Sequence, residues 1–214
     1  MTHATLNFTE NQGRAPELIE MIDQARSEGV DVSLDTYPYL PGCTTLAALL
    51  PSWASSGGPA ETLRRLEDAT LREKMRIAVE VTGCDGGHGI PTNWEEIQVS
   101  RRRTRKPNSS QVGSTSHSSI QAYSGRRISE IAQTCGVAPI QIFFEILQKD
   151  RLATSCIMHM GNEENVQAIL QHETHTAGSD AILHGKSTHP RAYGTFPRFL
   201  GEVQMSIHGI LADF

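Results

Sequence analysis

An aspartate and an arginine lie close together in the last fifth of the chain. Asp180 follows a Gly-Ser dipeptide, and Arg191 comes eleven residues later, within the segment HPRAYGTF at 189–196. A positioned carboxylate transfers protons, and a guanidinium offers a planar fork of donors that matches a carboxylate. The two residues therefore predict a site that handles a proton and binds an anion.

Each of these residues also has a purely structural interpretation. An aspartate after Gly-Ser often caps a helix, and an arginine often forms an exposed ion pair. The loop from Asp35 to Tyr39 can equally be a simple turn. A lone histidine is more often a surface or structural imidazole than a ligand, and none of the nine histidines has HxH or HExxH spacing. The functional interpretation is favoured because three polar segments each follow a plausible strand.

The elements that must position these residues alternate between helix and strand. Apolar residues at i, i+3 and i+4 predict helices, and short runs of β-branched residues predict strands. We expect helices at 16–28, 129–134, 138–149 and 162–172, charged helices over 59–81 with a break at 68–69, and strands at 30–34, 153–158 and 174–178. Asp180 then follows the last strand, at the edge where α/β barrels keep their chemistry.

Composition excludes several classes of protein. The chain has 214 residues, a net charge of −5 and 38% hydrophobic residues, which allows one large domain or one and a half. We expect no nucleic-acid partner and no membrane partner, because the net charge is negative and no apolar run approaches the roughly 18 residues of a membrane helix. The basic run at 101–106 alone supports a nucleic-acid role. Four cysteines without zinc or redox spacing predict reduced thiols and a cytoplasmic location.

Several separated motifs, in order, resemble the N-acyl-D-amino-acid deacylases (D-aminoacylases) of the amidohydrolase superfamily. The motifs are LDTYPY at 34–39, LPSWA at 50–54, EENV at 163–166, GSD at 178–180 and HPRAYGTF at 189–196. The resemblance implies an α/β fold, the C-terminal part of a metal-dependent (β/α) TIM-type barrel with an inserted, mainly helical lid. It implies barrel segments at 1–39 and 152–201 and a lid at 40–151. Residues 99–117 are expected to be disordered, and the tail 202–214 lies outside the resemblance.

The resemblance also implies roles for single residues. His3 matches a metal-ligand histidine of the family, and Asp180 matches the catalytic aspartate. Tyr37 and Arg191 match the residues that hold the substrate carboxylate. The expected reaction is hydrolysis of the amide of a small-molecule N-acyl-D-amino acid. In it, Zn²⁺ activates water and polarises the carbonyl, while Asp180 takes the water proton and returns it to the leaving nitrogen.

The sequence also departs from the family pattern. The other metal ligands of the family precede the matched segment, and one imidazole does not hold a catalytic zinc. Thr5 replaces a family lysine, and Cys43 replaces a small hydroxyl residue. We therefore expect the chain as written to be incomplete and inactive. The alternative is a non-catalytic interaction or regulatory fragment derived from this fold, and the sequence leaves the oligomeric state open.

Overall fold

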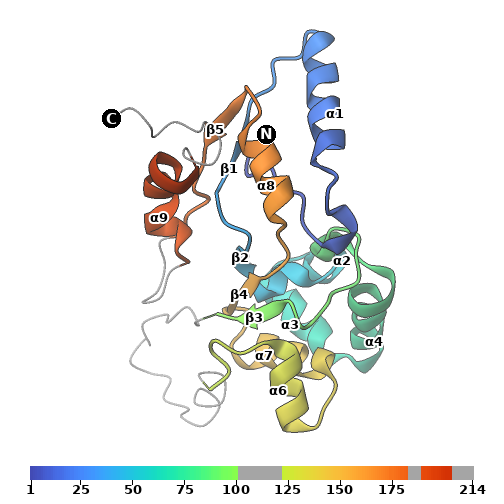
Figure 1. Ribbon diagram of the computed structural model, residues 1–214. Helices are drawn as coiled ribbons and strands as arrows, with labels where there is room; N and C mark the ends of the chain where they lie inside the picture. Colours follow the sequence, from blue (N-terminus) through green and yellow to red (C-terminus); the bar gives the residue numbers. More distant parts are fainter. Residues whose placement is uncertain (101–121, 183–188, 204–214) are drawn as a thin grey trace. The chain divides into compact units, whose positions relative to one another are not determined.

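The structure is a computed structural model that describes residues 1–100, 122–182 and 189–203, and it confirms a mixed α/β composition (Figure 1). The chain divides into two units. One comprises Met1–Gly42 with His159–Phe214, and the other comprises Cys43–Met158. The expected disorder at 99–117 falls almost entirely outside the described residues, as does the tail from residue 204. Val99 and Ser100 are the exceptions: Val99 ends a strand and is buried, and the backbone N–H of Ser100 donates to the carbonyl oxygen of Ser155 at 2.9 Å.

The first unit is built from two distant parts of the chain. Its helices and strands are α1 (Ala15–Ser27), β1 (Leu34–Thr36), α8 (Glu163–Leu170), β5 (His175–Ala177) and α9 (Arg191–Arg198), with short helical turns at Thr9–Asn11 and Phe199–Val203. Helix α1 has a proline in its first turn, where the missing N–H costs nothing. Asn162 caps the N-terminus of helix α8, because its side chain accepts the backbone N–H of Asn165 at 3.0 Å.

Strands β1 and β5 form a two-stranded parallel sheet, and they lie side by side in Figure 1. The register pairs Leu34 with His175 and Thr36 with Ala177. Because the strands are parallel, the segments that follow them, beginning at Tyr37 and Gly178, leave the sheet at the same edge. Parallel sheets bind their ligands at this carboxyl edge.

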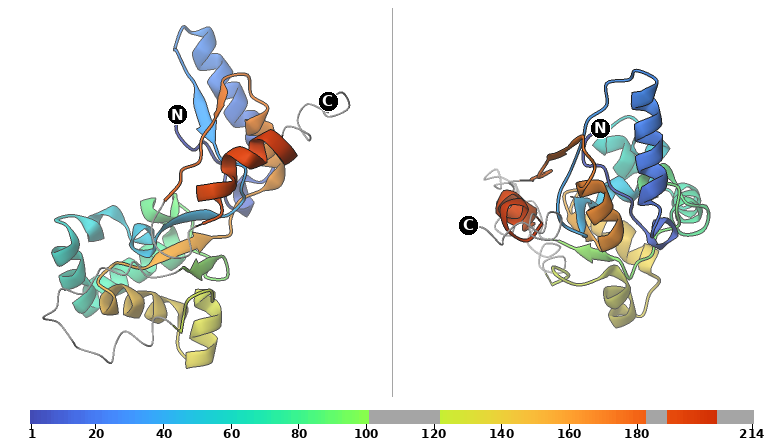
Figure 2. Two further views of the ribbon diagram at one scale, coloured as in Figure 1. Left: turned by 90° about the vertical axis from the view of Figure 1, so that its left-hand side faces the viewer. Right: turned by 45° about the horizontal axis from the view of Figure 1, so that its top comes forward.

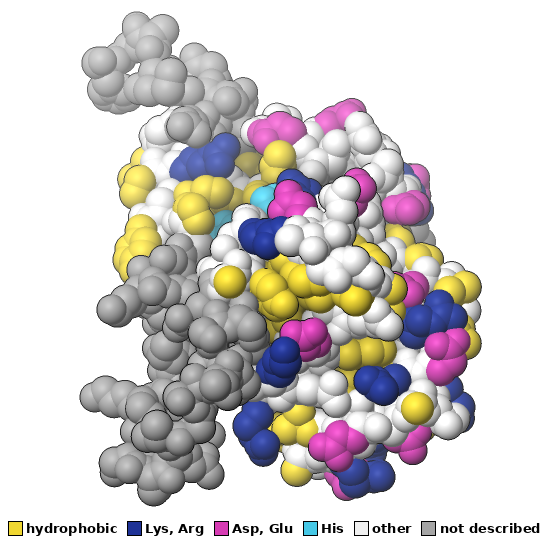
Figure 3. Space-filling model, turned by 90° about the horizontal axis from the view of Figure 1, so that it is seen from below, with side chains coloured by type: hydrophobic (Ala, Val, Ile, Leu, Met, Phe, Trp, Pro, Cys, Tyr) yellow, Lys and Arg dark blue, Asp and Glu magenta, His cyan; other side chains and the backbone are white. Residues whose placement is uncertain are grey.

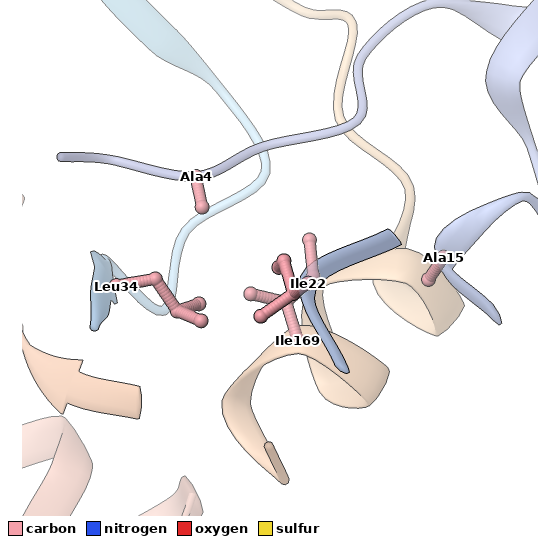
Figure 4. Close-up of a cluster of buried hydrophobic side chains, with 5 residues drawn as sticks. All are labelled: Ala4, Ala15, Ile22, Leu34 and Ile169. Carbon is pink, nitrogen blue, oxygen red and sulfur yellow. The ribbon is translucent and has the colours of Figure 1, made fainter. Parts of the chain in front are cut away.

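Burial of apolar side chains holds this unit together. Figure 4 shows the cluster, whose members come from the N-terminal segment, α1, β1 and α8: Ala4, Ala15, Ile22, Leu34 and Ile169. A second cluster contains Val166 and Leu170, with Leu40 and Phe199 packed against it. Burial of each large aliphatic side chain contributes about 1.5–3 kcal/mol.

A buried amide adds specificity to the apolar cluster. Asn165 on α8 is fully buried, and its Oδ1 accepts the backbone N–H of Ala15 at 3.2 Å. Its Nδ2 donates to the carbonyl oxygens of Asn11 at 2.7 Å and Leu6 at 3.3 Å. One side chain therefore satisfies three backbone groups of the N-terminal segment, which fixes α8 against the start of α1.

The second unit is mainly helical with one small sheet. Its elements are β2 (Gly42–Thr45, of which Gly42 still belongs to the first unit), α2 (Ser52–Ser55), α3 (Pro59–Glu67), α4 (Ala69–Ile77), β3 (Ile97–Val99), α6 (Ile128–Cys135), α7 (Pro139–Lys149) and β4 (Ser155–Met158), with helical turns at Leu46–Leu49, Ala78–Thr82 and Asp85–Gly87. The sheet order is β2-β4-β3, with β3 and β4 antiparallel. Helices α6 and α7 pack together, as both views of Figure 2 show. The rings of Trp94 and Phe143 lie 5.1 Å apart in the core.

Most of the predicted helices are confirmed, including the break between α3 and α4. Asp68 makes that break, because its Oδ1 accepts the N–H groups of Thr70 and Leu71 at 2.8 and 3.0 Å. The strand expected at 30–34 is wrong in position: it occupies 34–36, where β5 provides a partner, and Val30 is exposed. The strand at 174–178 is confirmed as β5.

The described surface carries both signs of charge. On the face in Figure 3, basic and acidic side chains are interspersed, without a large field of one sign. The basic run at 101–106 lies outside the described residues. No helix in the described ranges is long and apolar enough to cross a membrane.

Candidate functional site

Three of the four sequence-predicted site residues come into contact at the carboxyl edge of the β1–β5 sheet. Arg191, the first residue of α9, is buried, with 1% of its side chain exposed. Its Nη2 lies 2.8 Å from Oδ2 of Asp180, which follows β5. Its guanidinium carbon lies 4.8 Å from the ring centroid of Tyr37, which follows β1. A buried cation is thus held between a carboxylate and an aromatic face.

Helix α9 lies against the Tyr-Pro-Tyr loop through both of its arginines and through Gly194. Arg198 comes seven residues after Arg191, so both side chains lie on one side of the helix. Its guanidinium carbon is 5.0 Å from the ring centroid of Tyr39. Between the two arginines, Gly194 contacts the Tyr39 hydroxyl so closely that a methyl group there would collide with it. The loop and the helix therefore fix each other through two stacked arginine–tyrosine pairs.

His189 holds the start of α9. Its Nδ1 accepts the backbone N–H of Arg191 at 3.1 Å, and its ring meets Tyr39 edge-on with 5.7 Å between centroids. Burial, and next the charge of Arg191, lower the pKa of His189 to about 4. An imidazole that accepts at Nδ1 is neutral with its proton on Nε2, which agrees with this low pKa.

We expect His189 to titrate near pH 4 rather than at its ordinary 6.5. Because its folded pKa is depressed, the unfolded chain takes up the proton first. The stabilising contribution of neutral His189 is therefore complete above about pH 6.5 and is lost as the pH falls toward 4. NMR titration of the imidazole in the wild type, with a His189→Gln variant for assignment, measures this pKa. A midpoint near 6.5 contradicts the buried, neutral imidazole.

Asp35 links the fourth predicted residue, His3, to the same edge of the sheet. The Asp35 Oδ1 accepts the backbone N–H of His3 at 2.7 Å, and the Asp35 backbone accepts the N–H of Ala4 at 2.7 Å. An added Cβ at Gly178 would lie 2.6 Å from Asp35 Oδ1, so only glycine fits there. The His3 side chain is exposed, and its role as a metal ligand stays a prediction.

The described residues do not form a complete zinc site. No group of three or more histidine, cysteine, aspartate or glutamate side chains lies close enough to hold a metal in residues 1–100, 122–182 and 189–203. A catalytic zinc takes about three protein ligands. His3 alone therefore does not supply enough ligands to hold a zinc ion. The groups of this site that can act chemically are the side chains of Tyr37, Asp180 and Arg191.

Sequence reasoning missed three residues of this arrangement: Tyr39, His189 and Arg198. For Tyr39 and Arg198, the sequence contained a signal in the spacing of the two tyrosines and of the two arginines. Tyr37 and Tyr39 are two residues apart, which places them on one side of an extended loop, and the two arginines are seven apart. The spacing of the two arginines was not used, because it places them on one side only if residues 191–198 form a helix. Gly194 and Pro197 argue against a helix there.

Comparison with known proteins confirms the resemblance found in the sequence. No family model matches the chain. The N-acyl-D-glutamate deacylase of Alcaligenes xylosoxydans xylosoxydans is 27% identical over 202 residues, and the D-aminoacylase of the same organism is 26% identical over 201. Both alignments cover 94% of this chain and 29% of the relative. The chain thus spans less than a third of the length of these relatives.

Solved structures show a similar fold. The N-acyl-D-glutamate deacylase from Bordetella bronchiseptica, complexed with zinc and a phosphonate inhibitor, has a TM-score of 0.58 and 23% identity, covering 95% of this chain and 30% of that one. A D-aminoacylase that defines a novel subset of amidohydrolases has the same score and identity, covering 96% and 30%. A D-aminoacylase with a binuclear metal centre is also similar, with a TM-score of 0.58 and 24% identity, covering 96% and 31%.

Proposed function

We propose that this chain carries the carboxylate-binding part of an N-acyl-D-amino-acid deacylase, an amidohydrolase that releases a D-amino acid and a carboxylate. Arg191 and Tyr37 hold the α-carboxylate of the substrate, and Asp180 moves the proton. Similarity to the deacylases over 94% of the chain supports the reaction class. In the complete protein, the two paired strands belong to a (β/α) barrel, and residues 40–151 act as its lid.

One observation carries the proposal: Tyr37, Asp180 and Arg191 meet although the first is 143 residues from the second. A buried guanidinium beside an aromatic ring suits a planar carboxylate, since it offers two parallel N–H donors. An adjacent aspartate can take a proton from an attacking water and return it to the leaving nitrogen. A binding group and a proton-transfer group thus lie within one ion-pair distance.

We propose that the chain by itself binds substrate but does not turn it over. The relatives whose structures resemble this one hold zinc or a binuclear metal centre. His3 is the metal ligand that the resemblance assigns here, and one imidazole leaves the coordination of zinc incomplete. The alternative, a non-catalytic interaction or regulatory fragment, stays a prediction.

Calorimetry and a product assay on the purified chain test this function. We expect N-acetyl-D-alanine to bind and its methyl ester, which lacks the negative charge, to bind at least about tenfold more weakly. We expect no release of free D-alanine, with or without added zinc. Equal binding of the acid and the ester, or no binding of either, contradicts the carboxylate site. Turnover with stoichiometric zinc contradicts the proposed incompleteness and supports the enzyme assignment for this chain itself.

A further inference from the structure

We infer that Asp180 occupies the anion position of Arg191 until a substrate carboxylate displaces it. Arg191 is then a positioning residue for the proton-transfer group as well as a binding residue for the substrate. The inference rests on the proposed function, because it concerns how that site distinguishes N-acyl amino acids from other amides.

The ion pair itself is the first observation. Arg191 is 1% exposed, and its Nη2 lies 2.8 Å from Asp180 Oδ2. The ring of Tyr37 covers the guanidinium at 4.8 Å. A guanidinium in this environment needs an anion, since a buried charge without a partner is costly. In the ligand-free chain that anion is the side chain to which the proposed function assigns proton transfer.

The second observation is the asymmetry of the pair. The Asp180 side chain is 35% exposed, whereas the Arg191 side chain is almost fully enclosed. Asp180 also has a φ of 43°, in the left-handed region that aspartate tolerates better than most residues. The carboxylate is therefore the partner that can leave the pair, while the guanidinium stays fixed by α9 and Tyr37. An incoming carboxylate exchanges with the exposed partner of the pair.

This exchange makes the free α-carboxylate a condition for catalysis. When the substrate carboxylate binds Arg191, Asp180 loses its partner and is released for proton transfer. An amide without a carboxylate leaves the internal ion pair intact, so its hydrolysis lacks an available base. Specificity for N-acyl amino acids then arises from two effects of one arginine: it binds the substrate and it frees the aspartate.

An Asp180→Asn variant tests the exchange by calorimetry with N-acetyl-D-alanine. If the internal pair is formed about nine-tenths of the time, one-tenth of the molecules are competent to bind, and removing the competitor tightens the apparent Kd about tenfold. Asparagine suits the left-handed backbone of this position, so the variant keeps its local geometry. Asp31→Asn, at an exposed position, changes the net charge equally and is expected to leave the Kd unchanged.

A second measurement uses the unaltered chain. On titration with N-acetyl-D-alanine, the backbone amide resonance of Asp180 is expected to shift as Asp180 is released, and the methyl ester is expected to leave it in place. If Asp180→Asn binds no more tightly than wild type, or if Asp31→Asn tightens binding equally, the exchange is wrong while the carboxylate site stands. If neither wild type nor Asp180→Asn binds the acid, the proposed function fails, and the exchange fails with it.

Discussion

Arg191→Met is expected to weaken the binding of N-acetyl-D-alanine by at least about 30-fold. Truncating one partner of a buried charge pair costs about 2–5 kcal/mol, and each 1.4 kcal/mol is tenfold in Kd. Methionine fills most of the buried volume without the donors that a carboxylate needs. The fold is expected to survive, because the partner left behind, Asp180, is 35% exposed and remains solvated. Calorimetry gives the Kd, and circular dichroism reports the folded state.

Arg198→Met is the matched control for this variant. It removes a second guanidinium from the same helix and the same type of aromatic contact, at 5.0 Å from the Tyr39 centroid. We expect its Kd to stay within about threefold of wild type, because its effect is limited to the packing of α9. If the two methionine variants weaken binding equally, Arg191 has no special role in holding the carboxylate.

Asn165→Asp is expected to be the most destabilising single-atom change in the first unit. The side-chain Nδ2 donates to the carbonyl oxygens of Asn11 and Leu6, and the residue is fully buried. An aspartate oxygen in that position faces two acceptors without a proton to share. An uncompensated buried charge costs about 3–5 kcal/mol. Urea unfolding, compared at pH 7, measures the loss.

Asn162→Asp gives the control for this prediction. It makes the same chemical change three residues earlier, where the side chain accepts the N–H of Asn165 at the start of α8. Aspartate caps helices as well as asparagine does, so we expect a change within about 0.5 kcal/mol. Equal loss of stability in both variants would show that the hydrogen bonds of Asn165 do not fix the N-terminal segment.

The amphipathic helices could be predicted from the sequence because their apolar spacing is a local property. Helix α7 is an example, with Ile142, Phe143, Ile146 and Leu147 all buried. Strands β2 and β3 could not be predicted in this way. They have four and three residues, too short for an alternating pattern, and they form where β4 provides a partner. Helix α9 was missed because Gly194, which its close contact with Tyr39 favours, and Pro197 both lower the helical propensity.

The candidate site was predicted in part. The family resemblance assigned Tyr37 and Arg191 to one carboxylate-binding site, and Asp180 was placed beside it by the resemblance and by its position after a predicted strand. That the two ionised groups pair with each other did not follow, because both were expected to act on substrate. Nothing in their spacing of eleven residues shows whether they converge on a ligand or on one another. The neutral state of His189 was equally inaccessible, since its pKa depends on burial and on the nearby guanidinium.

The discontinuity of the first unit has a consequence for how the molecule acquires its structure. Leu34 pairs with His175, 141 residues later, whereas the second unit is one uninterrupted stretch. Contacts between distant residues form slowly. At a synthesis rate of about 5–20 residues per second, β1 is made roughly 7–28 s before β5, the strand with which it pairs. In that interval the second unit can already fold, while the apolar side chain of Leu34 stays exposed to solvent and is available for binding by chaperones.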